Sequence, residues 1–240
     1  TFNILLQIKC YYIFFKWCEY ISSKVSQRFE RYTVLSDKLK SEINVSVVAG
    51  IHATISSISS IFILIYSNNH FNSNDIYSVS LYSSTLLAFS CAYFLWDIMI
   101  CFRDKYSLSF KLHAIGCFFI YMIVNIPNPI FHWHAVYFLL NELSTPFLTI
   151  RTLIIKLQLQ YIYSNIFKLI NVVFISLFFI VRIVFGTSVK FRLANLCLKE
   201  IYNNNSYYLS IGLCFSVIMW ILNLYWFMLM IKSFNKNKRN

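Results

Sequence analysis

Long apolar stretches alternate with short polar segments along almost the whole chain. A membrane-spanning helix needs about 20 mostly apolar residues, because it must cross a hydrocarbon core about 30 Å thick. The pattern predicts seven transmembrane helices, at about 2–21, 45–66, 78–102, 111–127, 129–150, 166–186 and 208–231. The first is the weakest, because Lys9, Lys16 and Glu19 interrupt it, and an interfacial helix or a poor signal peptide without a small-residue cleavage site are the alternatives there.

The composition favours an all-α integral membrane protein over a soluble domain. Of the 240 residues, 58% are hydrophobic and 12% are charged, whereas soluble domains average about 25% charged residues. The net charge of +12 lies mainly in the connecting segments, which favours membrane topology over nucleic-acid binding. The seven Cys form no C-x-x-C pair, and they are interpreted as small apolar packing residues. We therefore expect no nucleic acid, no metal and no cofactor.

The charge of the connecting segments predicts the topology. Basic residues gather in 22–44, in 103–111, after the fifth helix and in the tail, whereas 67–77 and the turn near Pro127 have no Lys or Arg. Basic segments face the cytosol, so seven helices predict a lumenal N-terminus and a cytosolic C-terminus. The 187–207 segment is expected to be a lumenal loop, although Lys190, Arg192 and Lys199 depart from the rule.

The tail carries a candidate address. Lys236 and Lys238 stand fifth and third from the end of the sequence, the K-x-K-x-x form of a dilysine retrieval signal, which is read by coat proteins on the cytosolic side of the endoplasmic reticulum (ER). An ordinary stop-transfer charge cluster is the alternative. Receptor-read signals of this kind indicate location and not activity.

Five ionisable residues stand out inside the second to sixth predicted helices, and each needs a structural or functional reason, since burying such a group costs about 2.5–3.5 kcal/mol on insertion scales. They are His52, Asp97, His113, Glu142 and Arg182. Counted inward at about 1.5 Å per residue, the first four share one layer in the cytosolic leaflet, and Arg182 lies apart near the lumenal end. With Asn141 and Ser144, the four are predicted to line a polar layer of a lipid cavity. Hydrogen bonding between helices is the alternative.

Two features of the fifth helix concern its shape and its start. Pro146 should break or kink the helix, because proline lacks a backbone donor. His132 and His134 are two residues apart, so they do not face each other as metal ligands on a helix. With Trp133 they are interpreted as part of an interfacial belt.

Several short motifs occur in one order and together resemble the TLC-domain family. Glu142-Leu143-Ser144-Thr145-Pro146-Phe147 with Arg151 is similar to the family's E-L-S-[ST]-P-F-x-x-x-R. The other matching residues are His52 with Ala53, Asp97, His113, Asn171, Arg182, Asn223 and Trp226. The resemblance spans 44–232 and is nearest to the small members of the family. It leaves 1–43 as an N-terminal helix and basic segment, and 233–240 as a basic tail.

The resemblance implies six helices arranged as a barrel around a lipid-accessible cavity, location in the ER membrane, and a role in sphingolipid or phospholipid homeostasis. It implies binding, sensing or regulation of membrane lipids more than catalysis. The ceramide synthases of the family carry a His pair and H-D-x-S-D, where this chain has Leu112-His113 and Asn141-Glu142-Leu143-Ser144-Thr145. The alternative is an acyltransferase with acyl-CoA as co-substrate, His113 as base and Glu142 as its orienting residue. A third reading is an ER trafficking adaptor.

Overall fold

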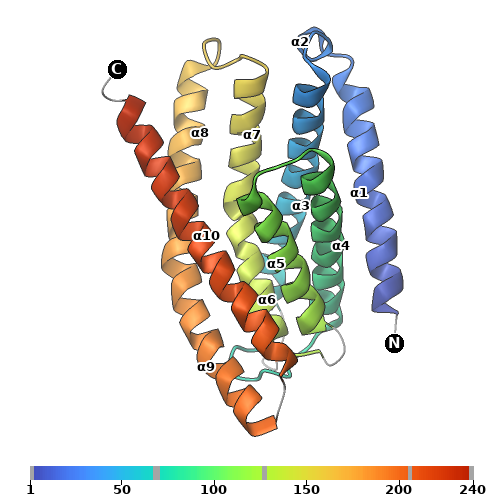
Figure 1. The fold of residues 1–240 in the computed structure, drawn as a ribbon, viewed down its shortest axis with the longest axis vertical. Helices are drawn as coiled ribbons and strands as arrows, with labels where there is room; N and C mark the ends of the chain where they lie inside the picture. The colour runs from blue at the N-terminus through green and yellow to red at the C-terminus, as the bar shows by residue number, and fades with distance from the viewer. Residues whose placement is uncertain (1–2, 67–70, 126–128, 205–206, 238–240) are drawn as a thin grey trace.

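The computed structural model describes residues 3–66, 71–125, 129–204 and 207–237, and within these ranges the chain is a bundle of helices without strands (Figure 1). The elements in chain order are α1 (Ile4–Ser26), α2 (Glu30–Thr33), α3 (Asp37–Tyr66), α4 (Leu81–Arg103), α5 (Leu108–Asn125), α6 (His132–Leu139), the 3-10 helix η1 (Leu140–Ser144), α7 (Thr145–Lys156), α8 (Ser164–Leu177), the π-helix η2 (Phe178–Phe185), α9 (Gly186–Asn204) and α10 (Tyr208–Asn237).

Among the described residues, six helical runs are long and apolar enough to cross a membrane. They are Asp37–Tyr66, Leu81–Arg103, Leu108–Asn125, His132–Lys156, Ser164–Asn204 and Leu209–Ser233. The predicted fold class, an all-helical multi-pass membrane protein, is confirmed. α1 is not one of the six but packs against α3 and α4, and its crossing of the membrane stays a prediction.

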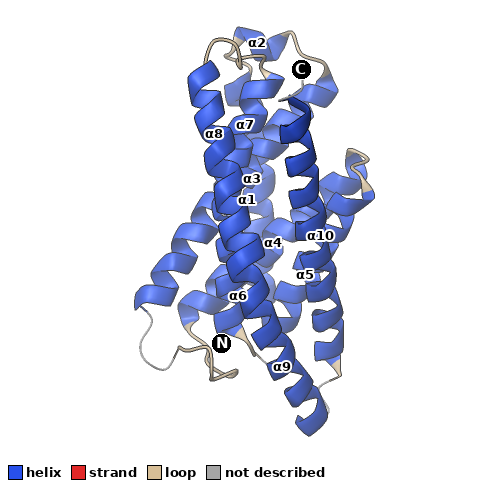
Figure 2. Ribbon diagram, turned by 90° about the vertical axis from the view of Figure 1, so that its left-hand side faces the viewer, coloured by secondary structure: helices blue, strands red, loops and turns tan. Residues whose placement is uncertain are grey.

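The two termini of the drawn chain lie at opposite ends of the bundle (Figure 1, Figure 2). The upper end in both views carries α2, the turn between α7 and α8, and the last turn of α10. We call it the basic end, because most of the connecting Lys and Arg residues lie there. The N-terminus and α9 lie at the other end, which we call the distal end.

α4 forms the centre of the packing. It contacts α1, α3, α5 and α6, and the side chains of Leu87, Ala88, Cys91 and Ala92 have no exposed surface. The small side chains of Ala88, Cys91 and Ala92 allow neighbouring helices to approach closely, which increases van der Waals contact between the helices, as is common in membrane proteins. The helices farther from α4 enclose the cavities described below.

The expectation of a loop at 187–207 is wrong. α8, η2 and α9 form one helical run from Ser164 to Asn204, and α9 reaches farthest toward the distal end (Figure 1). The polar residues of α9 interrupt the apolar stretch on which the prediction relied, but they do not break a helix, since the segment contains no Pro and its one Gly is the first residue.

Candidate functional site

A large cavity lies within the half of the bundle nearer the basic end. Its volume is about 1260 Å³, and α3, α4, α5, η1, α7, α8, η2 and α10 all contribute to its lining. At the basic end it reaches Tyr161, whose exposed fraction is 87%. Its inner part includes Asp97, His113, Glu142 and Arg182. The cavity thus combines mostly apolar walls with a polar inner end.

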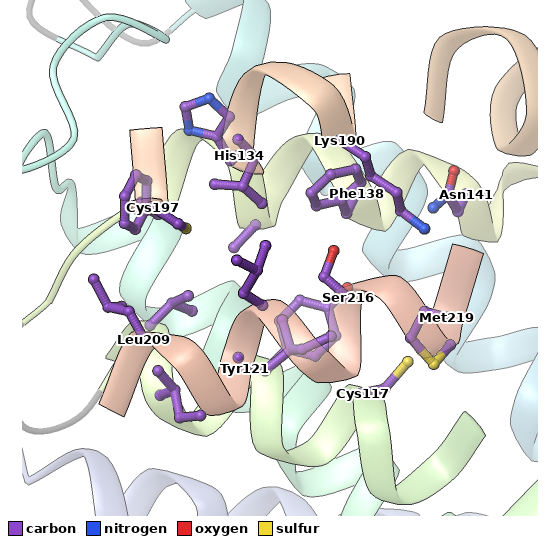
Figure 3. Close-up of a pocket in the computed structure, with 18 of the residues that line it drawn as sticks. Cys117, Tyr121, His134, Phe138, Asn141, Lys190, Cys197, Leu209, Ser216 and Met219 are labelled. Atoms are coloured by element: carbon purple, nitrogen blue, oxygen red, sulfur yellow. The ribbon is translucent and has the colours of Figure 1, made fainter. Parts of the chain in front are cut away.

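Figure 3 shows a small cavity of about 80 Å³, to which α9 at the distal end contributes lining residues. It lies between α5, α6, α9 and α10, and its lining is mostly aliphatic and aromatic. Its polar lining residues are His113, His134, Asn141, Glu142, Arg182, Lys190, Ser216 and Asn223. His113, Glu142 and Arg182 therefore border both cavities.

The two cavities meet at a buried ion pair. The guanidinium of Arg182 donates from Nη2 to Glu142 Oε1 at 3.3 Å and to Thr145 Oγ1 at 3.2 Å. It also donates from Nε to the Asn141 carbonyl at 2.9 Å and from Nη1 to Asn223 Oδ1 at 3.3 Å. Thr145 Oγ1 in turn donates to Glu142 Oε2 at 2.8 Å. A buried charge pair is stable only when further hydrogen bonds satisfy both groups, and this cluster supplies them.

Pro146 accounts for the backbone around Glu142. A proline has no N–H to donate to the carbonyl four residues earlier, which here is that of Glu142. The 3-10 helix η1 replaces the missing bond, because Thr145 N–H donates to the Glu142 carbonyl. The predicted effect of Pro146 is a change of helix type and not a complete break: α6 ends at Leu139, η1 follows, and α7 begins at Thr145 within one helical run.

The π-helix η2 positions the other half of the pair. Arg182 is in the middle of Phe178–Phe185, where the wider helical turn changes the direction of the side chains. The expectation that Arg182 lies apart from Glu142 is wrong. The depth count assumed that its helix ends near 186, whereas the helical run continues to Asn204 and places Arg182 near its middle.

His113 and Asp97 face the large cavity from α5 and α4. The His113 ring lies edge-on to Phe94 at 5.8 Å and to Trp226 at 5.3 Å between centroids. Its Nδ1 has no hydrogen-bond partner, and Nε2 has only the Cys117 thiol at 4.0 Å. Asp97 Oδ1 accepts from the Cys101 thiol at 3.9 Å. Both groups thus have hydrogen-bonding capacity that the protein uses only weakly.

His52 occupies a different environment from the rest of the predicted layer. It has no exposed surface and is absent from the lining of both cavities. Its ring stacks on Tyr93 with centroids 3.8 Å apart and planes 4° apart, and Nε2 lies 3.3 Å from Ser90 Oγ. The structure therefore places His52 between α3 and α4 as a packing residue.

The remaining predicted residues fall into two groups. Ser144 lines the large cavity and donates to the Asn141 carbonyl at 3.3 Å. Arg151 and Asn171 also line the large cavity and are joined by a hydrogen bond of 2.6 Å from Nε to Oδ1. Lys236 falls within α10 and Lys238 lies outside the described residues, so the retrieval signal stays a prediction.

The interpretation of His132 and His134 as an interfacial belt is wrong. Their exposed fractions are 0% and 1%. His132 Nδ1 lies 2.9 Å from Ser83 Oγ, and Nε2 lies 3.1 Å from the Val124 carbonyl. The segment before α4 covers this helix start, since Phe131 N–H donates to the Ile76 carbonyl at 2.6 Å. The burial of His132 and His134 by a segment distant in the sequence could not be predicted from the residues around them.

Sequence reasoning also did not identify Lys190 as a residue that lines the small cavity, because the segment around it was assigned to a loop.

Within the described residues, no group of three or more His, Cys, Asp or Glu side chains is arranged to hold a metal ion. The site is therefore two cavities separated by a charged hydrogen-bonded cluster.

These features define a multi-pass helical membrane protein with a central cavity. The TLC domain family model matches residues 42–232, and the chain belongs to that family. It is also similar to "Topoisomerase I damage affected protein 4" of Saccharomyces cerevisiae, with 28% identity over 213 residues, which covers 86% of this chain and 75% of the relative.

Proposed function

We propose that this protein binds membrane lipids in the large cavity and contributes to lipid homeostasis as a multi-pass protein of the ER membrane with a cytosolic C-terminus. The observation that supports the proposal is the combination of size and polarity in that cavity. A volume of 1260 Å³ exceeds the range of about 300–1,000 Å³ typical of small-molecule pockets, and so suits a chain-bearing lipid.

The distribution of lining residues suits an amphiphile. Phe174, Ile175 and Leu229 are among the apolar lining residues along which an acyl chain can lie. Asp97 and His113 offer hydrogen-bonding atoms to a polar group at the inner end. A ligand with both parts satisfies these groups and keeps the walls dry, since a polar group is best buried with a partner.

The test is to fill the cavity without changing the surface that surrounds it. Leu148 and Ile150 both lie on α7 and are exposed by 37% and 44%, but only Leu148 lines the cavity. Leu148→Trp should deplete the lipids that co-purify with the protein, as measured by mass spectrometry, and Ile150→Trp should retain them. Equal lipid content in the two variants, or no retained lipid in the wild-type protein, would contradict the proposal.

One observation favours acyl transfer as the second candidate. His113 borders the cavity with Nδ1 unpartnered, so it could accept a proton from an attacking amine. Against this stands Glu142, whose two oxygens bond Arg182 and Thr145 and so are not committed to orienting His113. Purified protein given acyl-CoA and a sphingoid base should form no ceramide. A product that disappears in His113→Ala would establish the enzyme.

The location rests on the tail. A fluorescent fusion of the full chain should be found in the ER, and replacing Lys236 and Lys238 with Ser should shift it toward later compartments. An unchanged distribution would show that the tail is an ordinary charge cluster.

A further inference from the structure

The small cavity contains a lysine without an anionic partner. Lys190 lies on α9 and lines this cavity. Its ammonium lies 5.7 Å from the centre of the Phe138 ring, but it makes no hydrogen bond or ion pair with any residue that the structure describes. Figure 3 shows its side chain passing Phe138 with the amine directed toward Asn141. Glu142, the carboxylate among the lining residues of this cavity, is already bonded to Arg182 and Thr145.

A second polar group in the same cavity also lacks a partner. His134 is 1% exposed, and neither of its ring nitrogens has a hydrogen-bond partner. Phe131 and Trp133 pack edge-on against the ring. Buried polar groups in proteins nearly always have partners, so an imidazole with two free nitrogens indicates that a partner from outside the chain completes this cavity.

The rest of the lining selects the kind of partner. Apolar side chains such as Leu193, Leu209 and Leu213 form most of the surface. A volume of 80 Å³ is several times the roughly 10–15 Å³ that one water needs. It therefore has room for a carboxylate or phosphate group and the first carbons of a chain, but not for a whole lipid.

We infer that the small cavity is a second, separate site that binds the anionic head of an amphiphile through Lys190, while His134 lies toward the other end of the same cavity (Figure 3). A negative head compensates a cation held among apolar side chains. The site is distinct from the large cavity because the cluster around Arg182 stands between the two, and each of the three guanidinium nitrogens of Arg182 already donates a hydrogen bond within that cluster.

The experiment uses three probes with one chain length: dodecanoate, dodecyl phosphate and dodecanol. Binding to the purified full chain is measured by native mass spectrometry for the wild-type protein, Lys190→Gln and Lys168→Gln. Lys168 is the matched control, because it lies on the same helical run but lines the large cavity. Lys190→Gln should weaken the anionic probes by about tenfold or more, the effect of losing one charge-assisted hydrogen bond. Dodecanol should be unaffected.

The two anionic probes identify the source of the head. Preference for dodecanoate indicates a fatty acid, and preference for dodecyl phosphate indicates a phosphate-bearing lipid. Equal binding by wild type and Lys190→Gln, or an equal loss with dodecanol, would overturn the inference. So would the same loss in Lys168→Gln.

Two further variants separate binding from folding. Lys190→Arg keeps the charge and should retain most of the binding. Lys190→Met removes an unpaired cation, so the ligand-free protein should melt no lower than wild type while losing the anionic probes. Leu148→Trp should leave the second site intact, so failure of the large-cavity proposal and failure of this inference are distinguishable.

Discussion

Arg182 and Glu142 are joined across 3.3 Å, although 40 positions separate them in the sequence. The bond ties the π-helix η2 to the 3-10 helix η1, the two places where the bundle departs from regular α-helix. Both residues are buried, with exposed fractions of 6% for Arg182 and 9% for Glu142. The irregular turns and the charge pair therefore depend on each other, because each turn aims one partner at the other.

Replacing one member of this pair should lower the free energy of unfolding more than replacing both members together. Arg182→Met leaves the Glu142 carboxylate buried without its cation, and Glu142→Met leaves the guanidinium without its anion. Each should lower the free energy of unfolding by about 3–5 kcal/mol, whereas replacing both with Met should cost less than either single change. Thermal melting in detergent of the four proteins measures this. A double variant that loses the sum of the two single effects would show that the residues act independently.

At the basic end, Arg103 links three elements and gives a pH-dependent contact. It donates to Glu19 on α1 at 2.7 Å, to Asp104 at 2.7 Å and to Ser41 on α3 at 3.0 Å. The hydrogen bond from Arg103 lowers the pKa of Asp104, and a bond from Ser41 adds to this effect. A carboxylate whose pKa is lower in the folded state than in the unfolded state stabilises the protein at pH values above its ordinary pKa. This stabilisation is lost as the pH falls through the folded-state pKa.

The stability difference between the wild-type protein and Asp104→Asn should therefore be constant near neutral pH. It should shrink once the pH falls below the ordinary pKa of 3.8. Melting temperatures of both proteins from neutral pH to pH 3 provide the measurement. A difference that grows on acidification would reverse the sign and contradict the assignment.

The sequence predicted the helices well because membrane spans are defined by local composition. The irregularity of the helix at Pro146 was also predictable, since the missing donor is a property of that residue alone. Arg182 was misplaced because depth was counted along a helix assumed to end at 186. The actual run to Asn204 includes polar residues that hydropathy does not recognise as helical.

The candidate site was less predictable, because cavities arise from the packing of distant segments. Asp97, His113 and Glu142 line one cavity, but His52 is turned into the contact between α3 and α4. At this depth the direction of a side chain around the helix decides between cavity and packing. A single sequence contains no direct measure of that direction.

The stacking of His52 on Tyr93 predicts a role in packing. His52→Ala removes a ring that has no exposed surface and should lower the free energy of unfolding by about 3–5 kcal/mol, as large-to-small changes of buried rings do. His52→Phe keeps a planar ring and should cost less, with the co-purifying lipids unchanged. Melting and lipid analysis of both variants test this. Loss of lipid from a stable His52→Phe protein would show that His52 contributes to lipid binding and is more than a packing residue.

The close approach of α3 and α7 gives a prediction about the wall of the large cavity. A Cβ added at Gly50 would lie 2.9 Å from Thr149 Cγ2, and Thr149 Oγ1 donates to the Ser46 carbonyl at 3.2 Å. Thr149 is held by that bond, so Gly50→Ala should push the helices apart and cost about 1–3 kcal/mol, the usual range for overpacking. Because Ser46 and Thr149 line the large cavity, lipid retention should change as well.

Gly212 provides the matched control for this change. A Cβ there would meet Ile123 carbons at 3.7 and 3.8 Å, which is ordinary contact, so Gly212→Ala should be tolerated. Adding Thr149→Ser to Gly50→Ala removes the methyl, which is the nearest of the three Thr149 atoms to the added Cβ, while keeping the hydroxyl, and should restore part of the stability. If the double variant melts as low as Gly50→Ala alone, the loss does not arise from this contact, and the wall of the cavity is held by other residues.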